Sequence, residues 1–149
     1  MDVHLQKRQA LMGTLAQAEW KDIAKAWSAL GLDPSFEIVR GPEIGTIALR
    51  GRIGGGGSPF NFGEATATRA TIKLDNGAVG HAVIMGRDKA KAKVAAVIDA
   101  LAQDPAHATV IDEKLIAPLA ALKAKADHAR ASETAATKVD FFTMVRGDD

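Results

Sequence analysis

Four consecutive glycines, residues 54–57, belong to the stretch of this sequence that comes nearest to a phosphate-binding motif. Between Gly51 and Ser58, glycines stand at both positions that a Walker phosphate loop requires, and Ser58 stands where a metal ligand would be. Gly57, however, occupies the position of the essential lysine, and Pro59 follows where a helix should begin. The stretch therefore favours a flexible hairpin or edge loop. Close backbone approach to a partner or an anion is the alternative, because glycine tolerates positive φ and close contact.

Arginines and lysines offer a second route to phosphate binding. Arg87 and Lys89 stand at the predicted start of a helix, where their charges and free backbone amides could hold a phosphate, although a surface helix with a solvated basic side explains them equally simply. Arg50, Arg52 and Arg69 alternate with apolar residues in predicted strands. If those strands are adjacent, the three arginines form either a cationic patch for a triphosphate or acidic partner, or a solvated sheet face. The candidate phosphate- or substrate-binding residues are Arg50, Arg52, Arg69, Arg87 and Lys89.

No complete catalytic set can be assembled from the remaining residue types. The chain has no cysteine, which excludes disulfides, thiolate metal sites, iron–sulfur ligation and cysteine nucleophiles. Its four histidines are not paired at metal-ligand spacing, and His81, in an apolar strand, is expected to be a hydrogen-bonded core residue. No serine lies in a nucleophile-elbow context. We therefore expect no metal and no cofactor in this chain, and its catalytic residues stay unknown.

Helical periodicity is present at both ends of the chain. Apolar residues between positions 5 and 30 recur at spacings of three and four, which predicts two helices, the second ended by Gly31. Asp88 is placed to cap a third helix, and an alanine-rich helical region with a boundary or kink at Pro118 extends to residue 137. The apolar residues predicted to face inward from these two regions are Val94, Val97, Ile98, Leu101, Leu115, Ile116, Leu119 and Leu122.

Alternating patterns in the middle of the chain predict an antiparallel sheet. Residues 44–53 and 66–74 alternate as half-buried strands do, and the segment Asp75 to Gly77 carries the Asn-Gly pair typical of a tight hairpin. The returning strand, residues 78–85, is apolar on both faces and is expected to be covered on both sides. Together the patterns predict an α+β fold, an antiparallel β-sheet packed with helices, in a single domain of residues 1–149.

Composition limits the classes of partner. The formal net charge is +1, so charge gives no case for nucleic-acid or membrane-surface binding. The stretch ALMGTLAQA behind Lys7 and Arg8 is amphipathic and interrupted by polar residues, unlike a signal peptide. We expect a cytoplasmic protein that binds neither nucleic acid nor membrane.

The last residues of the sequence are unusually apolar. In KVDFFTMVRGD, residues 138–148, strand alternation places Phe141 and Phe142 on opposite faces. A domain of this size has little material to cover both sides of a terminal strand, so the segment is expected to dock in its own sheet or against a partner. The candidate interface residues are Phe141, Phe142, Met144 and Val145.

Four segments, in this order and at these separations, resemble the PhnG family of the bacterial carbon–phosphorus lyase system: RIGGGGSPFNFGEATATRA, GHAVIMGRDKAKAKVAAVIDAL, LIAPL and KVDFFTMVRGD. The resemblance covers essentially the whole chain, and the terminal motif is its most specific part. It implies a non-radical subunit that acts with PhnI, PhnH and PhnJ, in two copies per complex. That complex is associated with forming ribose 1-phosphonate 5-triphosphate from ATP and a phosphonate, with release of adenine. No catalytic residue is carried over from the family.

Three hypotheses follow from these observations. The first is an assembly subunit that contributes cations to a shared substrate site. The second is a self-sufficient ATP- or phosphate-binding enzyme that uses the glycine run and Arg87. The third is a free-standing binding module, against which the near-neutral charge and few aromatic residues argue where nucleic acid is the ligand.

Overall fold

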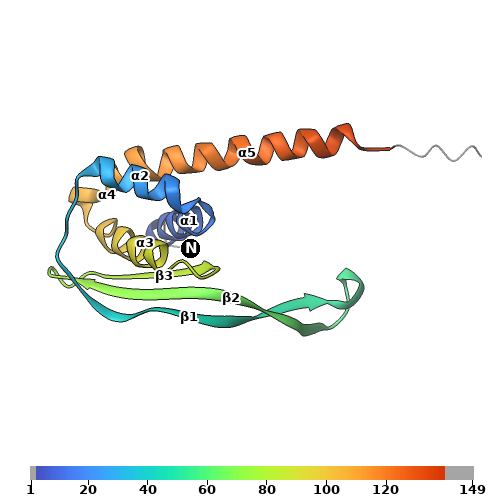
Figure 1. The fold of residues 1–149 in the computed structure, drawn as a ribbon, viewed down its shortest axis with the longest axis horizontal. Coiled ribbons are helices and arrows are strands. Elements are labelled where there is room, and N and C mark those ends of the chain that lie inside the picture. Colours follow the sequence, from blue (N-terminus) through green and yellow to red (C-terminus); the bar gives the residue numbers. More distant parts are fainter. Residues whose placement is uncertain (1–2, 140–149) are drawn as a thin grey trace, which may run out of the picture.

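The computed structural model describes residues 3–139, and in them helices cover one face of a three-stranded antiparallel sheet of order β1-β2-β3 (Figure 1). The predicted α+β fold, an antiparallel sheet packed with helices, is confirmed. The elements in chain order are α1 (Val3–Gln17), α2 (Trp20–Leu30), β1 (Phe36–Arg52), the 3-10 turn η1 (Ile53–Gly55), β2 (Pro59–Leu74), β3 (Val79–Met85), α3 (Lys89–Leu101), α4 (Pro105–Ile111), the π-helical turn η2 (Asp112–Ile116) and α5 (Ala117–Ala136). No helix among these residues is long and apolar enough to cross a membrane.

The predicted hairpin between β2 and β3 is confirmed, and its turn chemistry is visible. Gly77 has a φ of +88°, a backbone conformation that favours glycine. Asn76 Oδ1 accepts a hydrogen bond from the amide of Ala78 at 3.0 Å, which fixes the turn locally. The turn sets the register in which Thr71 lies opposite His81 and Thr68 opposite Ile84. The even-numbered residues of both strands therefore share the face that packs against helices.

Helix α3 lies directly on that face because the contacting residues are small. Asp88 caps the helix as predicted, accepting a hydrogen bond from the amide of Lys91 at 2.9 Å. Gly80 of β3 sits so close to the helix that a Cβ atom there would lie 1.9 Å from the carbonyl oxygen of Ala96 and 2.8 Å from Cβ of Ala100. The strand and helix backbones are thus in near contact, which only glycine facing alanine allows.

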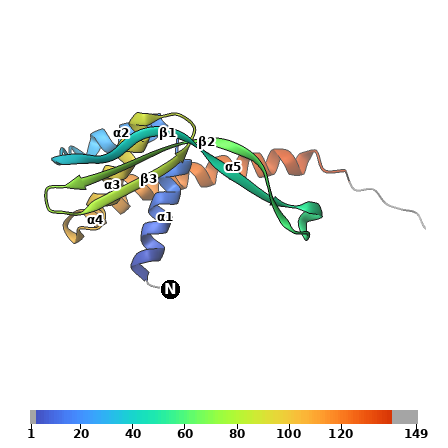
Figure 2. The same ribbon diagram turned by 90° about the horizontal axis from the view of Figure 1, so that it is seen from below.

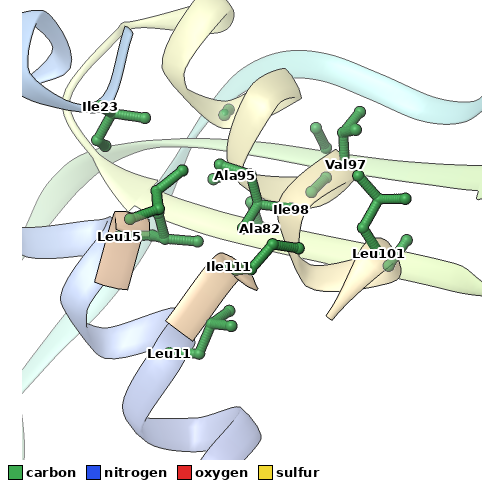
Figure 3. Close-up of a cluster of buried hydrophobic side chains, with 14 of the residues drawn as sticks. Leu11, Leu15, Ile23, Ala82, Ala95, Val97, Ile98, Leu101 and Ile111 are labelled. Carbon is green, nitrogen blue, oxygen red and sulfur yellow. The ribbon is translucent and has the colours of Figure 1, made fainter. Parts of the chain in front are cut away.

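The core fills the space between α3, the sheet and the N-terminal helices. Figure 3 shows side chains from α1, α2, β3 and α3, with Ile111 at the end of α4, gathered around one another. Ile23, Ile98 and Ile111 are fully buried, and Leu15 is 1% exposed. Burial of each such side chain contributes about 1.5–3 kcal/mol, so this cluster is the main source of stability that joins the helices to the sheet.

One buried charge also joins these elements. Asp99, on the inner stripe of α3, is 1% exposed and accepts hydrogen bonds from both Nε and Nη2 of Arg8 on α1, each at 2.8 Å. Its Oδ2 atom also accepts the backbone amide of His81 on β3 at 2.9 Å. The hydrogen bond to Asp99 raises the pKa of Arg8. Three elements that are distant in sequence therefore meet at one carboxylate.

The strands β1 and β2 continue well beyond the end of β3. The last pair of β2 with β3 is Ala67 with Met85, whereas β1 and β2 stay paired as far as Arg52 with Pro59. Residues 46–66, which we call the arm, therefore project from the body as a two-stranded hairpin (Figures 1 and 2). The glycine run closes the tip of the arm, with Gly54 and Gly55 at positive φ, so the hairpin-loop interpretation of this run is confirmed.

Three sequence-based predictions of burial are wrong for the described residues. Strand β3 is covered on one face only: Val83 is 56% and Met85 57% exposed, because the helices that pack on the sheet lie on its other face (Figure 1). His81 is exposed rather than in the core, with its Nδ1 atom 3.1 Å from the hydroxyl oxygen of Thr71. Leu122 was expected to face inward but is 52% exposed, because α5 leaves the body after the buried Leu119.

The boundaries of several elements also differ from those that alternation predicts. Strand β1 begins at Phe36 and β2 at Pro59, several residues before the predicted starts, and Ile53 belongs to the turn η1 rather than to a strand. Pro118 is the second residue of α5, directly after the π-helical turn η2, so the predicted boundary or kink coincides with a change of helix type. The predicted terminal strand, residues 138–148, lies almost entirely outside the described residues and stays a prediction.

The contact at Gly80 leads to a stability prediction. We expect Gly80→Ala to lower the free energy of unfolding by about 3 kcal/mol or more, because the new methyl group must push α3 off the sheet. Gly45→Ala is the matched control, since a Cβ atom at this other strand glycine meets nothing within 4 Å. Urea denaturation followed by circular dichroism measures both. Equal stability of the two variants would contradict the close packing described here.

The Asp99 carboxylate leads to a second stability prediction. Asp99→Asn removes the charge and leaves one of the two Arg8 donors facing an amide nitrogen that cannot accept, so it should lower the free energy of unfolding by about 1.5–3 kcal/mol. The control is Asp127→Asn on α5, which breaks ion pairs of the exposed side chains of Lys123 and Arg130 and should leave the unfolding midpoint unchanged. The same urea denaturation compares the two variants. An Asp99→Asn variant with unchanged stability would refute the role given to this carboxylate.

Candidate functional site

The cations predicted to bind phosphate are not gathered in one place. Arg50 lies opposite Asn61 and Arg52 opposite Pro59, both on the arm, whereas Arg69 lies opposite Glu43 in the body of the sheet. Eight residues of β2 separate Asn61 from Arg69, which at about 3.3 Å per residue places them roughly 26 Å apart. The arginines therefore belong to two separate surfaces, the arm and the sheet.

Each arm arginine has its own local surroundings. Arg52 donates a hydrogen bond from Nη1 to the carbonyl oxygen of Gly57 at 3.1 Å, and so helps to close the tip of the arm. Arg50 makes no such bond within the part of the chain that the structure describes. Arg50 thus has all of its guanidinium nitrogens left for an external ligand, whereas Arg52 has one of them engaged.

Arg87 and Lys89 lie on either side of Asp88, and the helix start there already has its capping hydrogen bond. The cap residue Asp88 accepts the amide of Lys91, so the capped-helix interpretation accounts for this segment. Lys91 donates from Nζ to the carbonyl oxygen of Ala16 at the end of α1, at 2.8 Å, and partial burial lowers its pKa. Lys91, in the first turn of α3, therefore serves the packing of α1.

The two features that a self-sufficient ATP site would combine are far apart. The glycine run closes the tip of the arm, while Arg87 follows the end of β3, where Met85 pairs with Ala67. Eight strand residues separate Ala67 from Pro59 at the base of that tip, again roughly 26 Å. The structure does not bring the glycine run and Arg87 into one site.

The open face of the sheet, opposite the helices, carries the densest group of charges on the strands. Arg69 Nε and Arg40 Nε lie 2.6 Å and 2.7 Å from the same atom, Oε1 of Glu43. These hydrogen bonds lower the pKa of Glu43, with Arg69 the larger cause. Next along the sheet, Lys73 Nζ lies 3.5 Å from Glu37 Oε1. Sequence reasoning identified Arg69 but missed Arg40, because the register shifts that bring Arg40 to this face cannot be read from alternation.

Several exposed apolar side chains lie on the arm. The rings of Phe60 and Phe62 lie 6.1 Å apart at 58°, and these residues are 44% and 60% exposed. Ring atoms of Phe62 lie 3.2 Å from where a Cβ of Gly51 would be, so the ring rests on the opposite strand. Ile53 at the tip is 68% exposed. The alternation Pro-Phe-Asn-Phe signals two aromatics on one side of a strand, and sequence reasoning passed over it in favour of the glycines.

The hollows of the described residues do not resemble an enclosed substrate pocket. One groove of about 500 Å³ is lined only by α5 and Lys138, so it has a single wall. A cavity between α1, α3 and β3 has a volume of about 20 Å³, which is room for about one water molecule. Within residues 3–139 no three His, Asp or Glu side chains are grouped to hold a metal ion. Neither of these two hollows, both lined by residues that the structure describes, is an enclosed pocket large enough for a small-molecule substrate.

The interface candidates at the end of the chain, Phe141, Phe142, Met144 and Val145, lie outside the described residues. Of the apolar residues in that segment, Val139 is described, and it is 67% exposed. Helix α5, which leads to it, projects from the same end of the body as the arm (Figures 1 and 2).

Comparison with known proteins agrees with the resemblance noted in the sequence. The model of a family described as phosphonate metabolism protein PhnG matches residues 6–147. A protein of Rhizobium meliloti (strain 1021), the alpha-D-ribose 1-methylphosphonate 5-triphosphate synthase subunit PhnG, is 49% identical over 148 residues, which cover 99% of this chain and 94% of that protein. The chain therefore belongs to the PhnG family.

Proposed function

We propose that this chain is the PhnG subunit of a complex that forms ribose 1-phosphonate 5-triphosphate from ATP and a phosphonate, with release of adenine. The name and the 49% identity of the Rhizobium relative support this assignment. The reaction transfers a ribosyl triphosphate group to the phosphonate, so the complex is a transferase. ATP is its substrate, and we assign no cofactor to this chain.

The role of the chain within that complex is mainly assembly. The observation that carries this proposal is the arm, a two-stranded hairpin without helical cover that displays Phe60, Phe62 and Ile53 to solvent. Two-stranded hairpins are marginally stable alone, and exposed aromatic side chains are typical of protein interfaces. A partner that packs against the arm would bury these side chains and hold the two strands together.

Helix α5 adds a second uncovered element. It is 20 residues long, and Leu119 is its one buried residue among those the structure describes. An exposed helix of this length gains most of its stability from tertiary packing, which the body of this chain supplies only at its first turn. We assign α5 and the apolar segment beyond it, residues 139–145, to the same contact region as the arm.

We assign the partner subunits as PhnI, PhnH and PhnJ, with two copies of this chain per complex in the cytoplasm. These assignments rest on the family, and the absence of cysteine fits a reducing compartment. Arg50, the arm arginine without a partner among the described residues, is available to contribute a cation to a shared site.

The arm gives a direct test of the assembly role. Replacement of Phe60 and Phe62 together by serine should weaken binding to the partner subunits by about 2 kcal/mol or more, because buried aromatic anchors dominate interfaces. The measurement is co-purification from co-expressed subunits, followed by titration of the purified components. Val3→Ser is the matched control, since Val3 is 62% exposed but lies on α1, away from the arm. Undiminished assembly by the double variant would contradict the proposal.

Adenine release tests whether the chain is catalytic alone. The folded chain mixed with ATP and methylphosphonate should release no adenine, because its described residues form surfaces and no enclosed pocket. The same mixture should release adenine when the partner subunits are added, and omission of this chain should reduce the rate. Chromatographic detection of adenine measures each case. Release by the isolated chain would support the self-sufficient enzyme instead.

A further inference from the structure

Two register shifts in β1, one between Ile38 and Arg40 and one between Arg40 and Glu43, bring Arg40 to the open face of the sheet. Between the pairs Arg40 with Thr71 and Glu43 with Arg69, β1 advances three residues while β2 advances two. Gly41 takes up the extra residue at a φ of +69°, and a Cβ atom there would lie 2.5 Å from the carbonyl oxygen of Arg69. The bulge therefore requires glycine, and through it Arg40 and Glu43 project on the same side of the strand.

The two arginines are held by their inner nitrogens. Both hydrogen bonds to Glu43 Oε1 come from Nε atoms, so the terminal nitrogens of Arg40 and Arg69 are not used in binding this carboxylate. No other interaction of either guanidinium group occurs within residues 3–139. Because the side chains of Arg40 and Arg69 are 55% and 53% exposed, their terminal nitrogens can reach a ligand from solvent. A carboxylate that fixes two arginines in this way lowers the entropy cost of binding an anion.

The neighbours of the pair add polar and positive groups. Thr71 lies opposite Arg40 on one side and His81 on the other, and the Thr71 hydroxyl meets His81 Nδ1 at 3.1 Å. Lys73 lies two residues further along β2. The face thus carries three cationic side chains against two carboxylates, Glu43 and Glu37, on open strands that the described helices leave uncovered.

We propose that Arg40 and Arg69, held by Glu43, form a binding site for a phosphoryl or phosphonyl oxyanion. A tetrahedral dianion offers three oxygens in different directions and can accept from both guanidinium groups at once. The site belongs to this chain alone, and so it goes beyond the assembly role. That its ligand in the complex is a substrate phosphate or phosphonate rests on the proposed function.

The test is a titration of the isolated full-length chain, labelled with ¹⁵N, with inorganic triphosphate and, separately, with methylphosphonate. Saturable shifts of the amide signals of residues 38–43, 69–73 and 79–83 are expected, with a midpoint of about 1 mM or below, against chloride at equal ionic strength. The tighter of the two ligands identifies whether the phosphoryl or the phosphonyl group is preferred. Linear shifts without saturation for both ligands would overturn the proposal.

Variants distinguish anion binding by these two arginines from attraction to positive charge in general. Arg69→Ala and Arg40→Ala should each raise the midpoint about tenfold, and Arg69→Lys should also raise it, because lysine keeps the charge but loses the planar fork. Arg130→Ala is the matched control: this arginine is also exposed and paired with a carboxylate, Asp127, but lies on α5 and should change the midpoint less than about twofold. Circular dichroism verifies that each variant is folded.

Two outcomes would reject the site. If Arg69→Lys binds as tightly as the unaltered chain, the face is only a charged patch. If the folded chain binds neither anion while Arg69→Ala abolishes co-purification with the partner subunits, the arginines recognise an acidic protein surface instead. Because the titration needs no partner, its result is independent of whether the complex assembles.

Discussion

The near contact between Gly80 of β3 and the backbone of α3 is the constraint on which the rest of the molecule depends. It places the helix so low on the sheet that the alanines of α3, rather than larger side chains, form the interface. At this depth Asp99 reaches the amide of His81 while still facing Arg8 on α1. The larger side chains of the core then fill the space above, where α1, α2 and the end of α4 meet α3 (Figure 3). Helix depth therefore determines where the N-terminal helices can lie.

The same arrangement explains why so much of the sheet is uncovered. Helices α3 and α1 lie directly on one face of the sheet, and α2, α4 and α5 lie above them, farther from the strands (Figure 1). The opposite face is left with charged and apolar residues side by side, and the arm has no helix on either face. A subunit of a larger assembly can tolerate such exposure because its partners complete the layers that the chain lacks.

Local chemistry was predictable from the sequence wherever it is set by a few neighbouring residues. The Asn-Gly turn and the Asp88 cap were predicted correctly, since each depends on contacts within about five positions. On the inner stripe of α3, Val97, Ile98 and Leu101 are buried as predicted, whereas Val94 is only partly buried. Coverage of β3 was predicted wrongly because alternation reveals which residues share a face but not how many layers pack on it. His81 was misplaced for the same reason.

Long-range side-chain pairings could not be predicted from the sequence. The partner of Asp99 is 91 positions away, and Arg40 shares the open face with Glu43 only because β1 shifts register on both sides of Arg40. One acidic residue within an apolar helical stripe, and one glycine before Pro42 in a strand, were the available signals. Each signal marks an unusual position in the sequence, but neither identifies the distant side chain with which that position interacts.

The continuity of β1 and β2 has a mechanical consequence. The pairing of β1 with β2 runs from Phe36 with Leu74 in the body to Arg52 with Pro59 at the far end. It shifts register three times, twice beside Arg40 and once between Leu49 and Arg50 on the arm. A protein that binds the outer end of the arm contacts the same two strands that carry Arg40 and Arg69 in the body. Tilting or twisting these strands would change the spacing of the two guanidinium groups, which gives assembly a physical means of adjusting the distant surface.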